Sequence, residues 1–304
     1  MSGHWSGRVC AIAESGLLLC GTAPWSAARQ PFWQQPLPAQ AQAWPAVGWS
    51  PPNTDAKIPT LSKAVPCDLS KVLEAAGRRA AELSSNLEKF AAQEKIEYKR
   101  TDFAGVLKES GTGTFNYTFA FEEVGIGRSS REYRAPAKGS YLFPGSEQDT
   151  GQVALALIFH PDLQTDYEMS CEGLDNRNGQ STWVVHFWQR KDRPGRTLQY
   201  VEGKDLIPTK LKGRAWISRE NGEIVHLETN LMEALPGLRV QAGAISIDYA
   251  PITLKSRSVT LYLPERIAAF WEFRDYRVML VHSFKDFKVF AVETEEQIQP
   301  AKEN

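Results

Sequence analysis

Net charge of either sign is nearly absent from the 304-residue chain, which carries 35 Lys and Arg side chains against 36 Asp and Glu. A protein that neutralises a phosphate backbone needs a basic surface, so nucleic-acid binding is not expected. Long hydrophobic runs are missing too, which excludes a membrane-spanning helix within the mature domain. The chain also lacks the G-x-S-x-G elbow, the P-loop, the Rossmann glycine motif and H-E-x-x-H. These absences leave a globular protein without an evident catalytic centre, and we expect no cofactor.

Composition changes along the chain and predicts its organisation. Residues 1–28 have the order of an export signal: one positive charge, a short apolar run and then small residues. Residues 29–66 are rich in proline and tryptophan and show no helical or strand period, so we expect an extended, poorly ordered linker. Residues 67–296 read as a single α+β domain and residues 297–304 as a tail. We therefore expect an exported protein, periplasmic or associated with the outer envelope.

Four cysteines are present, and two of them, Cys67 and Cys171, remain after removal of a signal. Neither lies in a C-x-x-C pair or at metal-ligand spacing from a histidine, which argues against zinc. An isolated pair in an exported protein favours a disulfide bond. The alternative is two buried thiols that pack as small apolar groups.

The pattern after Asp68 predicts one helix followed by many strands. Asp68 is a good N-cap, and an apolar stripe with steps of three and four predicts a helix over residues 68–95. Strand-like segments with short polar turns follow, among them a hairpin at Asn221–Gly222. The prediction is an α+β fold: a large curved antiparallel sheet of about ten strands, an incomplete barrel, packed around a long N-terminal amphipathic helix.

Histidines offer the only hint of catalysis. Neighbouring strands could bring His186 and His226 together, with Glu228 on the same face as His226. Such a cluster could hold a metal or act as a general base, which would make the protein an envelope hydrolase. One histidine per strand is more often a structural position, so this reading ranks last.

Eight stretches carry a resemblance to exported proteins of soil bacteria that have no established activity. They are LSKVLEAAGRRAAELSSNLEKFAAQEKIEY, ALALIFHP, YEMSCEGL, WVVHFWQRKDRP, LKGRAWIS, LETNL, LYLPERIAAFWEF and HSFKDFKVF. The order of elements resembles the bacterial lipoprotein-carrier superfamily, the LolA/LolB-like proteins. This second resemblance implies an apolar cavity for acyl chains, lined by aromatic side chains. The residues expected to line it are Phe115, Phe119, Trp183, Phe187, Trp216, Phe270 and Trp271.

The function that follows is non-catalytic. We expect a monomer that binds a lipid-like or apolar ligand, or a lipoprotein segment, outside the cytoplasm. The alternative is a protein-interaction module that meets other envelope proteins from a flexible stalk.

Overall fold

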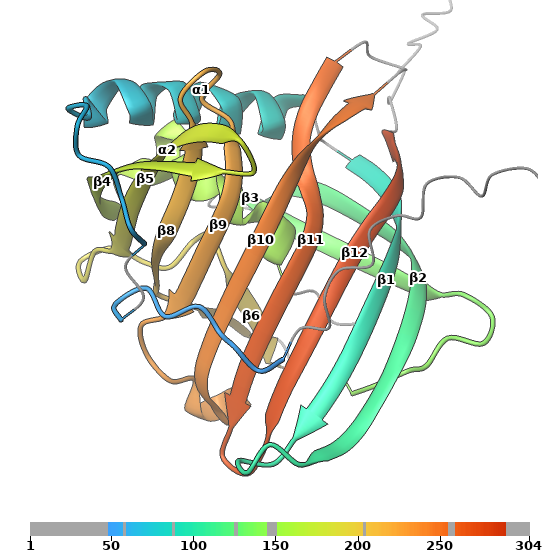
Figure 1. Cartoon of the computed structure of the whole chain (residues 1–304). Helices are drawn as coiled ribbons and strands as arrows, with labels where there is room; N and C mark the ends of the chain where they lie inside the picture. Colours follow the sequence, from blue (N-terminus) through green and yellow to red (C-terminus); the bar gives the residue numbers. More distant parts are fainter. Residues whose placement is uncertain are drawn as a thin grey trace, which may run out of the picture. The chain divides into compact units, whose positions relative to one another are not determined.

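A ten-stranded antiparallel sheet, in the order β3-β2-β1-β12-β11-β10-β9-β8-β5-β4, dominates the computed structural model (Figure 1). The structure describes residues 48–56, 59–86, 89–124, 127–144, 151–202, 205–254 and 259–289, all within the unit Gly48–Asn304. The open, curved sheet confirms the predicted strand architecture. The predicted export signal and the C-terminal tail lie outside the described residues.

The main sheet contains β1 (Lys89–Thr101), β2 (Leu107–Val124), β3 (Gly127–Pro136), β4 (Tyr167–Arg177), β5 (Gln180–Gln189), β8 (Leu211–Ser218), β9 (Ile224–Leu231), β10 (Val240–Leu254), β11 (Val259–Phe273) and β12 (Arg277–Val289). A separate pair is formed by β6 (Gln199–Glu202) and β7 (Asp205–Pro208). The helical elements are α1 (Leu69–Asn86), α2 (Pro161–Gln164) and the 3₁₀ helices η2 (Gln152–Phe159) and η3 (Pro236–Leu238).

Alternation along each strand gives the sheet two different faces. The inner face carries the hydrophobic core, with residues such as Phe115, Phe187 and Ile247, and the core continues into η2 and α1. The outer face carries Trp216 and His226, which pair in register between β8 and β9. Side chains on the two faces of the same strands therefore have different neighbours.

The helix is shorter than predicted, and it does not lie inside the sheet. It ends at Asn86, and residues 89–101 instead form β1, which pairs with β2 on one side and β12 on the other. Backbone hydrogen bonds to two neighbouring strands stabilise residues 89–101 as β1 more than the apolar stripe, which continues to Phe90, would stabilise them as a helix. Helix α1 crosses one end of the sheet in Figure 1 and contacts η2, α2 and the β8–β9 turn. No helix in the described ranges has the length and apolar character needed to cross a membrane.

Residues 49–56 and 59–62, which we call the strap, run across the outer face (Figure 1). The side-chain amide of Asn230 accepts a hydrogen bond from the Thr54 N–H at 3.0 Å and donates one to the Pro52 carbonyl at 2.8 Å. The guanidinium of Arg214 donates to the Thr54 carbonyl. This part of the predicted linker has specific partners, because Arg214 on β8 and Asn230 on β9 bind its backbone.

The predicted Cys67–Cys171 disulfide is present and links positions 104 residues apart. It joins the chain just before α1 to the middle of β4. Close by, Ser62 and Leu174 exchange two backbone hydrogen bonds of 2.8 Å. The end of the strap and the start of the helix are therefore both attached to β4.

Candidate ligand-binding site

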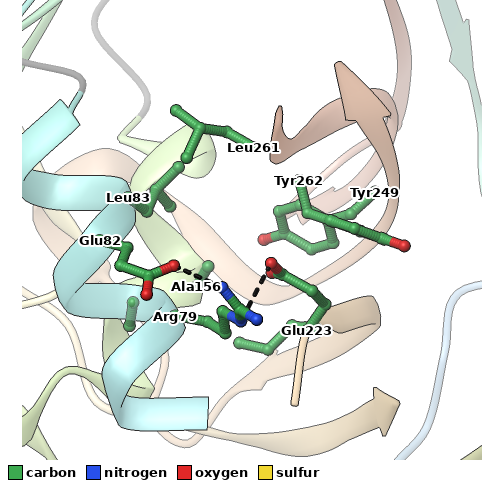
Figure 2. Close-up of a pocket in the computed structure, with 10 residues that line it drawn as sticks. Arg79, Glu82, Leu83, Ala156, Glu223, Tyr249, Leu261 and Tyr262 are labelled. Carbon is green, nitrogen blue, oxygen red and sulfur yellow. Dashed lines mark hydrogen bonds and ion pairs between the residues drawn. The ribbon is translucent and has the colours of Figure 1, made fainter. Parts of the chain in front are cut away.

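A small pocket opens where α1 meets η2 and the strands β9, β10 and β11 (Figure 2). Elements far apart in sequence build it, and the β8–β9 turn brings its polar edge against the helix. The lining residues are Arg79, Ala80, Glu82, Leu83, Ala156, Glu223, Ile224, Tyr249, Leu261 and Tyr262.

The polar side of this pocket is centred on Arg79. Its Nη1 lies 2.6 Å from a Glu82 carboxylate oxygen, and its Nε lies 3.4 Å from Glu223. Nε also donates to the Asn221 carbonyl at 3.0 Å, which fixes the guanidinium between the helix and the turn. Burial raises the pKa of the Glu223 carboxyl to about 7, although the charge of Arg79 acts in the opposite direction. The rim therefore carries a carboxyl group that titrates near neutral pH.

The other side of the pocket is apolar. Leu83 of α1 and Leu261 of β11 lie next to each other in Figure 2, and Ala156 of η2 also lines the pocket. Tyr249 is buried, and burial raises the pKa of its hydroxyl. The free volume of about 20 Å³ has room for one water-sized group, so a larger ligand enters only if the walls move apart.

The seven aromatic residues predicted to line a cavity divide between the two faces. Six are buried, and Trp183 is partly buried against the core. Trp216 and Phe270 belong to the outer face, where Phe270 meets Trp49 of the strap at a ring-centroid distance of 5.6 Å. The members on the inner-face side are Phe115, Phe119, Trp183, Phe187 and Trp271. None of the seven lines the pocket, and a role of these five core residues in ligand binding stays a prediction.

A buried ionic cluster lies on the inner face among these aromatic side chains. Glu94 receives two hydrogen bonds from Arg134, at 2.7 and 3.2 Å, and lies 2.7 Å from Nδ1 of His282. The second carboxylate of the cluster is Glu132, 2.9 Å from Arg134. Burial alone would raise the pKa of Glu94, but the hydrogen bond from His282 and the charge of Arg134 hold it below its ordinary value. Glu94 is therefore an ionised carboxylate inside the core.

On the outer face, His226 and Glu228 lie together, as the hydrolase alternative required. Nε2 of His226 is 3.3 Å from Glu228, and Nδ1 is 2.7 Å from Asp248. The hydrogen bond from His226 and the charge of Arg177 lower the pKa of Asp248 to about 2, against the effect of burial. Nδ1 also lies 2.8 Å from Nη2 of Arg177, so both ring nitrogens of His226 have partners within the protein.

His186 is not part of that cluster. It lies on β5, and β8 separates it from β9, which places the two backbones about 9.5 Å apart. Burial and the nearby charge of Arg214 lower the pKa of His186. Within the described ranges, no group of three or more His, Cys, Asp or Glu side chains has the arrangement of a metal site.

The pocket and the inner cluster contain residues that sequence reasoning did not single out. Arg79 and Glu94 both fall within residues 68–95, the range predicted as one helix, and no motif marks either of them. Glu223 directly follows the predicted Asn221–Gly222 turn, so the sequence places it near the end of a strand but gives no sign of its contact with α1. Glu94 and His282 are 188 positions apart in the chain, and the pairing of β1 with β12 brings them together. Local periodicity therefore gives no sign of their contact.

No protein-family model matches the sequence, and a search of curated proteins finds no match. Solved structures do resemble it. A domain described as an outer membrane lipoprotein-sorting protein from Vibrio parahaemolyticus matches with a TM-score of 0.42 and 13% identity, over 75% of this chain and 96% of that one. A DUF1329 family protein from Desulfovibrio piger matches with a TM-score of 0.42 and 8% identity, over 75% of this chain and 95% of that one.

A LolA superfamily protein from Nitrosomonas europaea matches with a TM-score of 0.31 and 9% identity, over 75% of this chain and 96% of that chain. With TM-scores below 0.5, these likenesses carry no argument about the family, the ligands or the individual residues of this chain.

Proposed function

We propose that this protein binds a lipid-like, apolar ligand without catalysis, outside the cytoplasm. The observation that carries the proposal is the pocket between α1, η2 and strands β9–β11, where apolar side chains such as Leu83 and Leu261 meet an ionic rim. The pocket is narrow, but its walls belong to separate elements, so it can widen when they part. The Cys67–Cys171 disulfide supports a location outside the reducing cytoplasm.

The geometry of the ionisable residues supports a binding role over a catalytic one. His226 is enclosed by Asp248 and Glu228, while the pocket rim holds an Arg79–Glu223 ion pair instead of a histidine. A rim of this kind can orient the polar end of a ligand, and the slot can accept its hydrocarbon part.

Lipid extraction tests the proposal. Full-length protein, purified without detergent, is extracted with organic solvent, and the extract is analysed by mass spectrometry. Two variants are compared with the wild type: Leu83→Glu, which places a charge in the pocket, and Leu107→Glu, which changes a side chain that is 55% exposed on β2.

We expect co-purifying lipid in the wild type and in Leu107→Glu, and about tenfold less in Leu83→Glu, because a carboxylate cannot be buried against hydrocarbon without a large cost. Folded wild-type protein that carries no lipid and binds no added lipid would contradict the proposal. That outcome would favour the interaction-module alternative.

A further inference from the structure

A groove lies between α1 and the β8–β9 turn, which meet at one end of the sheet (Figure 1). Its free volume is about 410 Å³, compared with about 20 Å³ in the small pocket described above. Small-molecule sites occupy roughly 300–1,000 Å³, so the groove can hold a ligand without movement of its walls. Among the described residues, the two hollows share Arg79 alone, and the groove is therefore a separate site.

Contacts between α1 and the turn fix both walls of the groove. Lys71, Ala75 and Arg78 follow the i, i+4 and i+7 spacing, so they lie on one face of α1. Gly222 of the turn has a φ of 75°, and a Cβ atom added to it would lie 2.8 Å from the Cβ of Ala75. The turn therefore packs directly on the helix at that point, and Arg79 joins the two through a hydrogen bond of 3.0 Å to the backbone of the turn.

The floor of the groove is apolar. Val72 of α1 and Ile217 of β8 are buried, and Trp183 of β5 is partly buried against the same core. The guanidinium of Arg219 lies over the ring of Trp183, with its Cζ 5.9 Å from the ring centroid. A ligand in the groove therefore contacts hydrocarbon and positive charge at the same place.

The charged residues that line the groove are mostly basic. They are Lys71, Arg78, Arg79 and Arg219, against the single carboxylate of Glu220. Lys71 and Arg78 contact carboxylates of α1 at 3.1 and 2.6 Å, but both partners in each pair are at least half exposed. Exposed pairs of this kind contribute at most about 1 kcal/mol, so a bound anion can displace these carboxylates. Arg219 makes no ion pair within the described part of the chain, so its charge is also available to a ligand.

We infer that this groove binds the head of an anionic amphiphile, a phosphate monoester joined to a hydrocarbon chain. Lys71, Arg78 and Arg219 contact the phosphate, and the part of the molecule next to it lies on the apolar floor. A phosphate monoester carries a charge of about −1.5 to −2 and three acceptor oxygens, so cations on two walls can bind it at once. Arginine suits this role because its planar fork binds phosphate through two parallel hydrogen bonds. The inference goes beyond the proposed function, because it assigns a second site and a charged class of ligand.

The test is a titration of three ligands into the full-length protein at pH 7.5, at concentrations below micelle formation. The ligands are 1-lauroylglycerol 3-phosphate, 1-monolauroylglycerol and glycerol 3-phosphate, which separate the effect of the phosphate from that of the chain. We expect the first to bind about tenfold more tightly than either of the others, because the monoglyceride lacks the charge-assisted hydrogen bonds and glycerol 3-phosphate lacks the apolar contact.

Variants of both walls assign this preference to the groove. In Arg219→Gln and in Lys71→Gln, the preference for the phosphate over the monoglyceride should fall by at least about threefold. Lys138→Gln removes an exposed cation on the turn after β3 and is the matched control. It should keep the wild-type preference.

A second measurement locates the bound ligand. In protein labelled with ¹⁵N at tryptophan, 1-lauroylglycerol 3-phosphate should shift the indole resonance of Trp183, identified with Trp183→Phe, and leave that of Trp188 in place. Any of four results would overturn the inference: an unmoved Trp183 resonance at saturation, equal affinity for the phosphate-bearing and the neutral lipid, glycerol 3-phosphate binding as tightly as its lauroyl ester, or an unchanged preference in Arg219→Gln and Lys71→Gln.

These results are independent of the small pocket. Leu83→Glu changes the pocket and should bind 1-lauroylglycerol 3-phosphate within about twofold of the wild type. Because the groove is open to solvent, its ligand exchanges during purification, so co-purifying lipid reports on the pocket and titration reports on the groove. A failure to bind 1-lauroylglycerol 3-phosphate would therefore overturn this inference alone, whereas lipid extraction tests the proposed function.

Discussion

Replacement of Arg134 by methionine should lower the free energy of unfolding by about 3–5 kcal/mol at pH 7.5. Arg134 binds Glu94 at 2.7 Å and Glu132 at 2.9 Å, and the exposed fractions of the three side chains are 2%, 0% and 0%. Methionine fills much of the same volume but leaves two carboxylates in the core without their cation. The cost comes from these uncompensated charges, since the lost attraction alone is largely offset by desolvation of the arginine.

The matched control is Arg78→Met. Arg78 binds Glu74 at 2.6 Å on the surface of α1, where the two side chains are 63% and 70% exposed. A pair of this kind contributes about 0.3–0.5 kcal/mol. Both variants lose an arginine at a distance of less than 3 Å from a carboxylate, so burial is the main difference between them.

Urea unfolding followed by tryptophan fluorescence measures both effects. The decrease in the free energy of unfolding caused by Arg134→Met should depend on pH, because it depends on the charge of Glu94. In the wild type the pKa of Glu94 is lowered, so its contribution to stability is present above its unfolded pKa and is lost as the pH falls through the folded one. Without Arg134, its charge and its hydrogen bonds no longer lower the pKa of Glu94, so that pKa is higher than in the wild type. Protonation then relieves the penalty, and the loss should be smaller at pH 5 than at pH 8. A loss below about 1 kcal/mol at pH 7.5, or one equal to that of Arg78→Met, would refute the reasoning.

Three further predictions concern the pocket rim, the strap and the disulfide. Glu223→Gln should stabilise the protein by about 1–2 kcal/mol at pH 8 and by almost nothing at pH 5. The folded pKa of Glu223 is raised to about 7, so the wild-type protein loses stability as the pH rises from the unfolded pKa of this carboxyl towards that value. Urea titrations at the two pH values check this. Asn230→Ala should cost about 1–3 kcal/mol and speed amide hydrogen exchange at Thr54, because it removes that N–H group's acceptor; unchanged exchange would contradict it. Replacement of both Cys67 and Cys171 by alanine should cost about 2–5 kcal/mol in chemical denaturation, since the bond closes a loop of 104 residues.

The strand architecture could be predicted because each strand carries its own alternating pattern. The end of the helix could not, because Phe90 fits two patterns at once. It continues the helical stripe from Leu83, and it also begins an alternation with Ala92, Ile96 and Tyr98, all of which are buried on β1. Pairing with β2 and β12 decides between the two, and those partners are contributed by distant parts of the chain. Local periodicity therefore locates elements more reliably than it locates the boundary between a helix and an adjoining strand.

The strap shows a different limit. Its composition predicts a segment without a helical or strand period, but composition does not show what binds that segment. Asn230 and Arg214 bind backbone atoms of the strap. Two of the strap's own side chains also make contacts, Trp49 with Phe270 and Asp55 with Lys212. A proline-rich segment satisfies few of its own backbone groups, and polar side chains on a neighbouring sheet can bind them instead.

The polar networks around His226 and His282 differ in the hydrogen-bond partners that each ring has. On the outer face, His226 has a carboxylate at each ring nitrogen, so its hydrogen-bonding capacity is used within the protein. On the inner face, His282 has Glu94 at Nδ1 and, within the described residues, no partner at Nε2. A buried ring nitrogen without a partner opposes folding, so the network around His282 stabilises the sheet less completely than the network around His226 does.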